Sequence, residues 1–198
     1  YKTDLSIDMV LFINGIPFST LELKNLQTRQ DEINGEKQYK RRGINEPLLK
    51  FQRCLVHFVV GTEKVSMTTN VDGENTKFFP FKKDIENPLN PNGHKTSYLW
   101  EDILTKDSIL DLIKNFVYLE KEKVEKTNPR TGKLEKKQKE SLIFPRFHQL
   151  RVVRNLKQKI LTGGVGKDYL IQHSTGSGKS LSIAVSYTHL RAHETVAN

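Results

Sequence analysis

Three ionic side chains, Asp8, Glu22 and Lys24, interrupt an apolar stretch near the amino terminus. Charged groups are costly among apolar residues unless they have a partner, so their placement is informative. Carboxylates hold Mg²⁺, which prefers oxygen ligands, activates bound water and neutralises charge on a phosphate. A nearby lysine can stabilise the negative charge that develops during hydrolysis. These residue types predict a metal-dependent site for phosphodiester hydrolysis, with Asp8, Glu22 and the backbone of Leu23 as metal ligands.

These side chains are expected on a β-hairpin. Residues 5–13 and 16–24 are β-prone apolar runs on either side of Asn14-Gly15, a dipeptide typical of tight hairpin turns. Glu22 and Lys24 lie two positions apart on the second run, so they point to the same face of a strand. The alternative is an ordinary strand whose charged residues face solvent. Glu-x-Lys alone does not exclude it, because the pattern recurs in a charged segment further along the chain.

The register of this hairpin decides whether the three side chains can share a metal. With a two-residue turn and unbroken pairing, residues 7 and 22 would be opposite one another, and Asp8 and Glu22 would point to opposite faces. A shared metal therefore requires a three-residue loop or a β-bulge, and a type I turn with a G1 bulge suits Asn14-Gly15. We predict that irregularity, because a two-residue turn with unbroken pairing would exclude the metal site.

A second candidate site lies near the carboxyl terminus, where residues 173–180 read His-Ser-Thr-Gly-Ser-Gly-Lys-Ser. They follow Tyr169–Gln172, which we expect to form a short buried strand, and a helix is expected to begin near Lys179. Strand, glycine-rich loop and helix together make a phosphate-binding loop, in which Lys179 reaches the phosphates and the Ser180 hydroxyl ligates Mg²⁺. The alternative is a turn that caps a helix. The expected ATP-binding residues of the loop are Thr175, Gly176, Ser177, Gly178, Lys179 and Ser180.

The chain divides into regions of different composition. Residues 1–119 contain the hairpin, further strand signals and helical spacing, and we expect them to form one α/β domain. Residues 120–141 are almost wholly charged and predict a solvated linker or excursion between domains; a basic arm that contacts DNA is the other interpretation. Residues 142–185 begin with an amphipathic helix and end with the phosphate loop. Residues 186–198 lack helical spacing, and we expect this tail to be non-native.

Composition restricts the environment and the partners. The 198 residues include 32 Lys and Arg against 23 Asp and Glu, a formal net charge of +9 that suits a polyanion such as double-stranded DNA. Cys54 is the only cysteine, which excludes an intrachain disulfide or a cysteine-based zinc site and fits a reducing cytoplasm. No apolar run approaches the roughly 20 residues that span a bilayer. We therefore expect a cytoplasmic protein with no membrane segment.

Together these motifs resemble the R subunit of type I restriction–modification enzymes. The resemblance rests on the hairpin with Asp8 and Glu22-Leu23-Lys24, on residues 53–69 and 90–100, and on the segments at 144–149 and 172–180. It implies a mixed-sheet PD-(D/E)xK nuclease domain, followed by the start of a RecA-like superfamily 2 motor with its phosphate loop. Residues 144–149 resemble the Q motif of such motors, whose glutamine binds adenine, and this implies that Gln149 contacts ATP.

The resemblance implies an ATP-dependent, site-specific endonuclease and translocase that cuts foreign double-stranded DNA with Mg²⁺ and ATP. It also implies a complex with modification (methyltransferase) and specificity subunits, and an internal fragment that lacks the later motor motifs. Gly35 departs from the pattern, since related nucleases often carry a glutamine four residues before the tyrosine that is Tyr39 here. The alternatives are a DNA translocase or remodeller whose first domain binds DNA without cutting, and a non-motor phosphate-loop protein. The basic charge argues against the latter.

Overall fold

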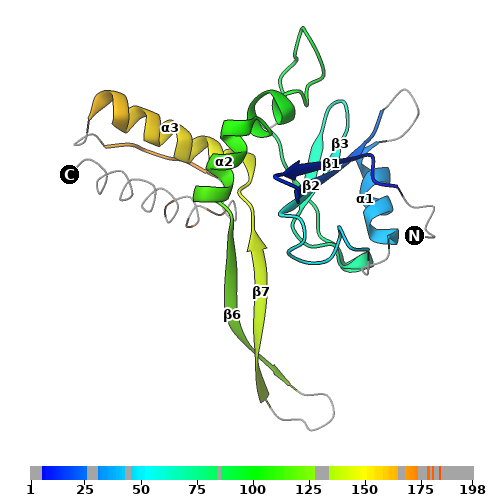
Figure 1. The fold of residues 1–198 in the computed structure, drawn as a ribbon. Coiled ribbons are helices and arrows are strands. Elements are labelled where there is room, and N and C mark those ends of the chain that lie inside the picture. The colour runs from blue at the N-terminus through cyan, green and yellow to red at the C-terminus, as the bar shows by residue number, and fades with distance from the viewer. Residues whose placement is uncertain are drawn as a thin grey trace.

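A five-stranded mixed sheet forms in the first half of the chain (Figure 1). The computed structural model describes residues 6–25, 31–42, 46–83, 86–127, 134–164 and 168–173, together with Gly178, Ser180 and Ile183. The strands follow the order β1-β2-β3-β4-β5, and all neighbours are antiparallel except β2 and β3. The strands are β1 (Met9–Ile13), β2 (Ile16–Leu23), β3 (Val56–Val60), β4 (Val65–Thr68) and β5 (Phe79–Pro80).

The parallel pair explains where the first helix lies. Parallel strands need a crossover connection, and the chain between β2 and β3 contains α1 (Glu32–Arg41). The Asp31 side chain caps this helix by accepting a hydrogen bond from the Asn34 backbone N–H at 3.1 Å. The expected mixed α/β class is confirmed for this part of the chain. The other helical elements are the 3₁₀ turn η2 (Gly73–Asn75), the π-helical η3 (Leu99–Ile103), α2 (Lys106–Asn115) and α3 (Phe147–Gly163).

Each face of the sheet has its own hydrophobic core, because successive side chains of a strand point to opposite faces. On one face, α1 packs over Val59, and the smaller core there comprises Tyr39, Leu49, Val59 and Val71. The opposite face carries the larger core, which η3, α2 and α3 cover. Its residues include Phe58, Phe81, Leu99, Leu112 and Leu150. The side chains of Glu22 and Lys24 lie on the face of the sheet that α1 covers. The larger core packs against the opposite face.

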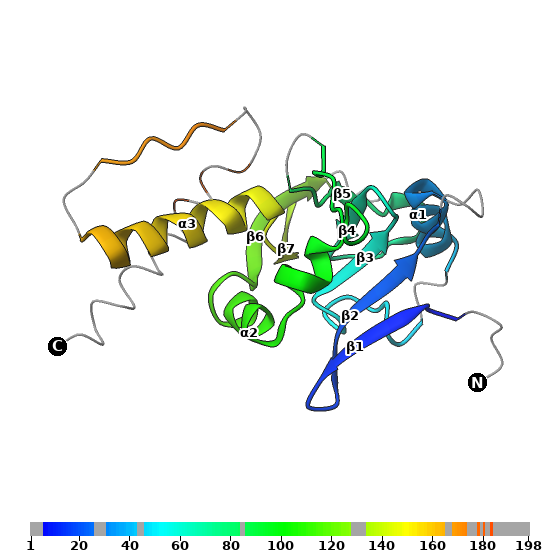
Figure 2. The ribbon, with the colours of Figure 1, turned by 90° about the horizontal axis from the view of Figure 1, so that it is seen from above.

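The amino-terminal end of α3 belongs to the larger core. Phe147, Leu150 and Val153 are at most 4% exposed and pack in the same cluster as Phe58. Phe144, just before the helix, contacts the Phe58 ring edge-to-face with centroids 6.1 Å apart. The far end of α3 extends away from the sheet (Figure 2). The region expected to start the ATPase therefore shares a core with the sheet. A RecA-like domain is not formed by the described residues.

The charged segment forms a long antiparallel ribbon, β6 (Tyr118–Thr127) and β7 (Leu134–Ile143), that projects from the rest of the fold (Figure 1). We expected this segment to be a solvated linker or an excursion between domains. The structure shows an excursion that consists of two β-strands. Lys121 and Glu140 lie opposite one another in the ladder and form an ion pair at 3.0 Å. None of the helices in the described ranges combines the length and apolar character needed to cross a bilayer.

Candidate active site

The first hairpin contains the irregularity that a shared metal requires. Its turn is a two-residue one, since Ile13 pairs with Ile16 and both Asn14 (φ 49°) and Gly15 (φ 80°) lie in the left-handed region of a type I′ turn. The ladder then shifts between Leu11 and Phe12. The predicted bulge is therefore confirmed, but it does not lie at the turn, where we expected it.

The bulge lies in β2. Leu11 pairs with Ser19 and Phe12 with Pro17, so Phe18 is the extra residue. A proline cannot donate to a ladder, and within sheets it occurs at edges and bulges, which explains this position. Phe18 is 2% exposed and packs into the larger core, so burial of its ring holds the bulge in place.

Beyond the bulge, the register brings the three predicted side chains together. Met9 pairs with Leu21, so the next pair in register joins Asp8 and Glu22 on one face. Lys24 Nζ lies 3.4 Å from Glu22 Oε2 and 3.9 Å from Asp8 Oδ2. The ammonium group therefore lies within ion-pair distance of both carboxylates.

The two carboxylates differ in their surroundings. The Asp8 side chain is 39% exposed, and its Oδ2 accepts a hydrogen bond from the Leu23 backbone N–H at 2.8 Å. The Glu22 side chain is 1% exposed and that of Lys24 is 4% exposed. The site is thus open to solvent at Asp8 and closed at Glu22. The Leu23 carbonyl, expected as a third metal ligand, remains a prediction.

A cation that we did not predict completes this cluster. Arg42, the residue after α1, lies with Nη1 2.5 Å from Glu22 Oε1. The geometry is that of an ion pair rather than a well-aligned hydrogen bond. Nothing in the sequence distinguishes Arg42 from Arg41, because both end the same basic helix. Only the structure separates them, since Arg42 is 7% exposed whereas Arg41 is exposed.

The donor set fits Mg²⁺. Two carboxylates, one just before β1 and one on β2, supply hard oxygen ligands, and Mg²⁺ usually keeps several waters, so a larger protein cage is not required. Within the described ranges no group of three or more His, Cys, Asp or Glu side chains could hold a metal. The candidate site therefore depends on Asp8 and Glu22, with a backbone carbonyl as the expected third ligand.

Gly35 allows α1 to approach this site. A Cβ atom at Gly35 would lie 2.4 Å from Val59 Cγ1 and 3.2 Å from Lys24 Cε. In the sequence, Gly35 was notable only as a departure from the pattern of related nucleases. The structure gives the reason for the glycine, because the Lys24 stem and the β3 side chain both pass beneath the helix at this position.

We expect Gly35→Ala to destabilise the chain by about 1–3 kcal/mol, the usual cost of overpacking, although alanine is the better helix former by about 1 kcal/mol. Urea unfolding would measure this change. Val59→Ala removes the contacting methyl group, so in that background the same Gly35→Ala change should be neutral or stabilising. Equal effects in both backgrounds would show that the Val59 contact does not explain the glycine.

A neutral hydrogen-bond network lies beside the charged cluster on the α1 face. Thr20 Oγ1 lies 2.8 Å from the Tyr39 hydroxyl and 2.7 Å from His57 Nδ1. The Tyr39 and His57 rings meet edge-to-face, with centroids 5.8 Å apart. Burial lowers the pKa of His57 to about 4 and raises that of Tyr39 above its usual value. Both groups are therefore uncharged at neutral pH, so the nearby charge comes from the carboxylates and their cations.

The pKa of His57 predicts acid sensitivity. Because its folded pKa of about 4 lies below the ordinary histidine pKa of 6.5, the unfolded chain binds the proton more tightly between these values. The free energy of unfolding should therefore fall as the pH drops from 6.5 to 4, by about 3 kcal/mol in total from this residue. Urea unfolding at several pH values would test this. His57→Gln should flatten the dependence, whereas His94→Gln, at an exposed position, should not.

Of the expected ATP site, the structure describes Gln149, Gly178 and Ser180; the other named loop residues, Thr175, Gly176, Ser177 and Lys179, lie outside the described residues. Gln149 Oε1 accepts from the Arg146 N–H at 2.9 Å, and its Nε2 donates to the Gly178 carbonyl at 3.2 Å. The glutamine thus contacts the loop.

The strand expected at Tyr169–Gln172 is wrong. This segment has no strand geometry, and Leu170 is 94% exposed. A buried strand needs neighbours in a sheet, and the described residues provide none for this one. The ATP site therefore remains a prediction.

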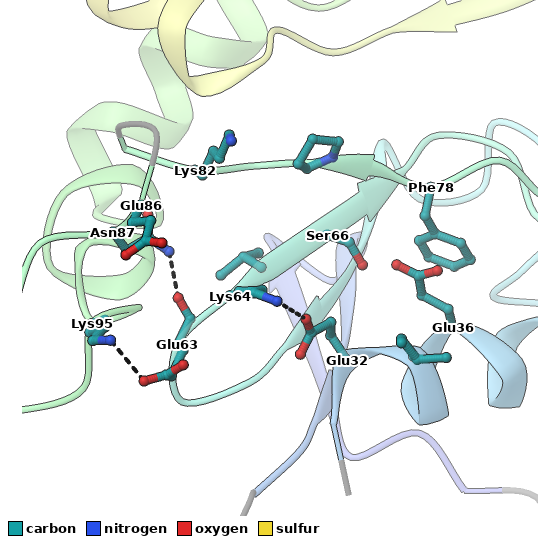
Figure 3. Close-up of a pocket in the computed structure, with 13 residues that line it drawn as sticks. Glu32, Glu36, Glu63, Lys64, Ser66, Phe78, Lys82, Glu86, Asn87 and Lys95 are labelled. Atoms are coloured by element: carbon teal, nitrogen blue, oxygen red, sulfur yellow. Dashed lines mark hydrogen bonds and ion pairs between the residues drawn. The ribbon is translucent and has the colours of Figure 1, made fainter.

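A separate groove of about 400 Å³ lies beside α1, between its first turn and β4 (Figure 3). Ion pairs occupy much of its rim: Lys64 reaches Glu32 at 3.3 Å and Lys95 reaches Glu63 at 2.7 Å. None of the predicted catalytic residues lines it. The groove is therefore distinct from the carboxylate–lysine cluster.

Comparison with known proteins shows which proteins this chain is similar to. Residues 2–78 match the family model "Type I restriction enzyme R protein N terminus", and they include Asp8, Glu22, Lys24 and Arg42. Over 184 residues the chain is 32% identical to the putative type I restriction enzyme MjaVIIIP endonuclease subunit of Methanocaldococcus jannaschii. That alignment covers 89% of this chain and 16% of the relative. The chain is therefore similar to the amino-terminal part of the R proteins of type I restriction enzymes. No solved structure matches it significantly.

Proposed function

We propose that this chain carries the DNA-cutting centre of a type I restriction enzyme, hydrolysing phosphodiesters of double-stranded DNA with Mg²⁺. The observation that carries the proposal is the position of Lys24, within ion-pair distance of both Asp8 and Glu22. The match of residues 2–78 to the family model and the name of the relative support a nuclease within a restriction system. The net charge of +9 suits a DNA partner.

Each residue has a defined part in this proposal. Asp8 and Glu22, with the Leu23 carbonyl, would hold the metal, which when bound supplies Lewis acidity and lowers the pKa of its water. Asp8, the more exposed carboxylate, would be the one nearer to a DNA phosphate that enters from solvent. Lys24 would orient the attacking water or stabilise charge on the phosphate. Its buried stem restricts the positions that the ammonium can take.

We also propose that ATP drives DNA translocation by a longer protein, of which this chain is one part. Gln149 would bind adenine, while Lys179 and Ser180 would contact the phosphates and Mg²⁺. The hydrogen bond from Gln149 to the Gly178 carbonyl supports this arrangement, because it brings the glutamine to the predicted phosphate loop. Modification and specificity subunits would supply recognition of the DNA sequence.

Cleavage of supercoiled plasmid by the intact R subunit, assembled with its partner subunits, tests both parts. Nicking and linearisation should require Mg²⁺ and ATP together and should be lost on Lys179→Ala. Cleavage without ATP, unaffected by this substitution, would separate cutting from the phosphate loop. No cleavage under any condition, with DNA binding retained, would indicate a domain that binds DNA without cutting it.

A further inference from the structure

The candidate site contains a cation that the proposed chemistry does not use. Arg42 and Lys24 bind different oxygens of the Glu22 carboxylate: Arg42 Nη1 lies 2.5 Å from Oε1, and Lys24 Nζ lies 3.4 Å from Oε2. With Asp8 included, the cluster holds two formal negative and two formal positive charges. The cluster is therefore neutral as a whole, and Oε2 is the Glu22 oxygen on the side of Lys24 and Asp8.

Arg42 is fixed by contacts outside the cluster. Its Nη2 donates to the Ser6 carbonyl, and its guanidinium carbon lies 5.4 Å from the centroid of the Tyr39 ring. Its backbone N–H closes α1 by donating to the carbonyls of Gln38 and Tyr39. With 7% exposure it has little access to water. Moving Arg42 would break all these contacts, so its guanidinium group has a fixed position beside Glu22.

Lys24 is the more weakly held of the two cations. Its ammonium contacts Glu22 at 3.4 Å and Asp8 at 3.9 Å, both longer than the Arg42 contact. A divalent cation held by these carboxylates would displace the Lys24 ammonium more readily than the Arg42 guanidinium. Arg42 would remain, and its charge would oppose that of the incoming metal.

We infer that Arg42 is a positioning residue for Glu22 and also a resident counter-cation that lowers the affinity of the site for divalent metal. This inference rests on the proposed function. It gives Arg42 two opposed effects on the site. Arg42 keeps the Glu22 carboxylate aligned in the metal-free protein, with Oε2 on the side of Lys24 and Asp8. It also makes metal binding weak, because the carboxylate that must bind the metal is already neutralised at its other oxygen.

Metal binding to the 198-residue chain tests this inference without any cleavage assay. Isothermal titration with Mn²⁺ as the probe would be compared for wild type, Arg42→Gln and Arg42→Lys. We expect Arg42→Gln to bind Mn²⁺ at least about tenfold more tightly, because a positive charge within a few ångströms is removed. Arg42→Lys keeps the charge and should stay close to wild type. The matched control is Arg41→Gln, which makes the same change at the neighbouring exposed position and should leave the affinity unchanged.

Arg42→Gln leaves Glu22 buried without its nearest partner, so the variant can lose stability. The second measurement is therefore the thermal midpoint as a function of Mn²⁺ concentration. The midpoint of Arg42→Gln should rise more steeply than that of wild type, because the metal replaces the missing counter-cation. A rise no steeper than that of Arg41→Gln, or weaker Mn²⁺ binding by Arg42→Gln, would overturn the inference.

These outcomes are separable from failure of the proposed nuclease. If wild type binds Mn²⁺ and Glu22→Gln abolishes binding, but Arg42→Gln leaves the affinity unchanged, the metal site stands and the role of Arg42 is wrong. If Mn²⁺ binding is detected in none of the proteins, both the metal site and the counter-cation role fail. If Arg42→Gln binds more tightly and plasmid is still not cut, the role of Arg42 stands and the nuclease proposal fails.

Discussion

Plasmid cleavage by the assembled enzyme is expected to fall at least about 100-fold when Glu22 is replaced by glutamine. The substitution keeps the shape of a side chain that is 1% exposed but removes the charge that would hold the metal. It also leaves Arg42 and Lys24 without their shared partner. The rate of conversion of supercoiled to linear plasmid, measured with Mg²⁺ and ATP, is the direct readout.

The matched control is Glu74→Gln, which makes the same change at an exposed glutamate in η2 and should leave the rate unchanged. Circular dichroism of both variants would establish that they are folded. If Glu22→Gln is folded and cuts at the wild-type rate, the nuclease centre lies elsewhere and the hairpin is only structural. Lys24→Ala should give a loss of similar size, since its ammonium contacts both carboxylates.

Leu150→Ala is expected to lower the free energy of unfolding by about 2–5 kcal/mol, the usual cost of truncating a buried leucine. Leu150 is 1% exposed and lies in the core that also contains Phe58 of the central strand β3. If the amino-terminal end of α3 belonged to the motor alone, this substitution would leave the sheet unaffected. The structure instead predicts that the sheet and α3 unfold together.

Leu161→Ala supplies the comparison, because Leu161 lies on the same helix but is 67% exposed. It should change the unfolding free energy by less than about 0.5 kcal/mol. Urea denaturation followed by far-ultraviolet circular dichroism would measure both variants. Two separate transitions in wild type, with only the minor one shifted by Leu150→Ala, would show that α3 is not part of the core of the sheet.

Local rules predicted the hairpin and the residues of its site. Asn14-Gly15 favours a tight turn on its own, and the spacing of Glu22 and Lys24 fixes their common face. The bulge followed from one further condition, that Asp8 must share this face. Its location could not be predicted in the same way, because burial of Phe18 in the larger core decides it, and that core forms from segments distant in sequence.

Arg42 and Leu170 show where local rules fail. Arg42 differs from Arg41 only in its direction at the end of α1, and that direction depends on how the helix packs on the sheet. Leu170 lies in a run that has the composition of a buried strand, yet it is 94% exposed because a strand is buried only when neighbouring strands cover it. The composition of a segment indicates which secondary structure it favours, whereas its contacts with neighbouring segments decide whether that structure forms.

The ribbon of β6 and β7 has a consequence for solubility. Among the residues that the structure describes, its strands pair only with each other, so each leaves an outer edge of backbone N–H and C=O groups that another chain could extend. Glutamate and lysine alternate closely along β6, and Glu125 and Lys136 pair across the strands at 3.9 Å. Charged side chains along an open edge hinder its pairing with a second copy. In this ribbon, alternation of charge protects the protein from association through its edges, and we expect neutral substitutions there to promote aggregation.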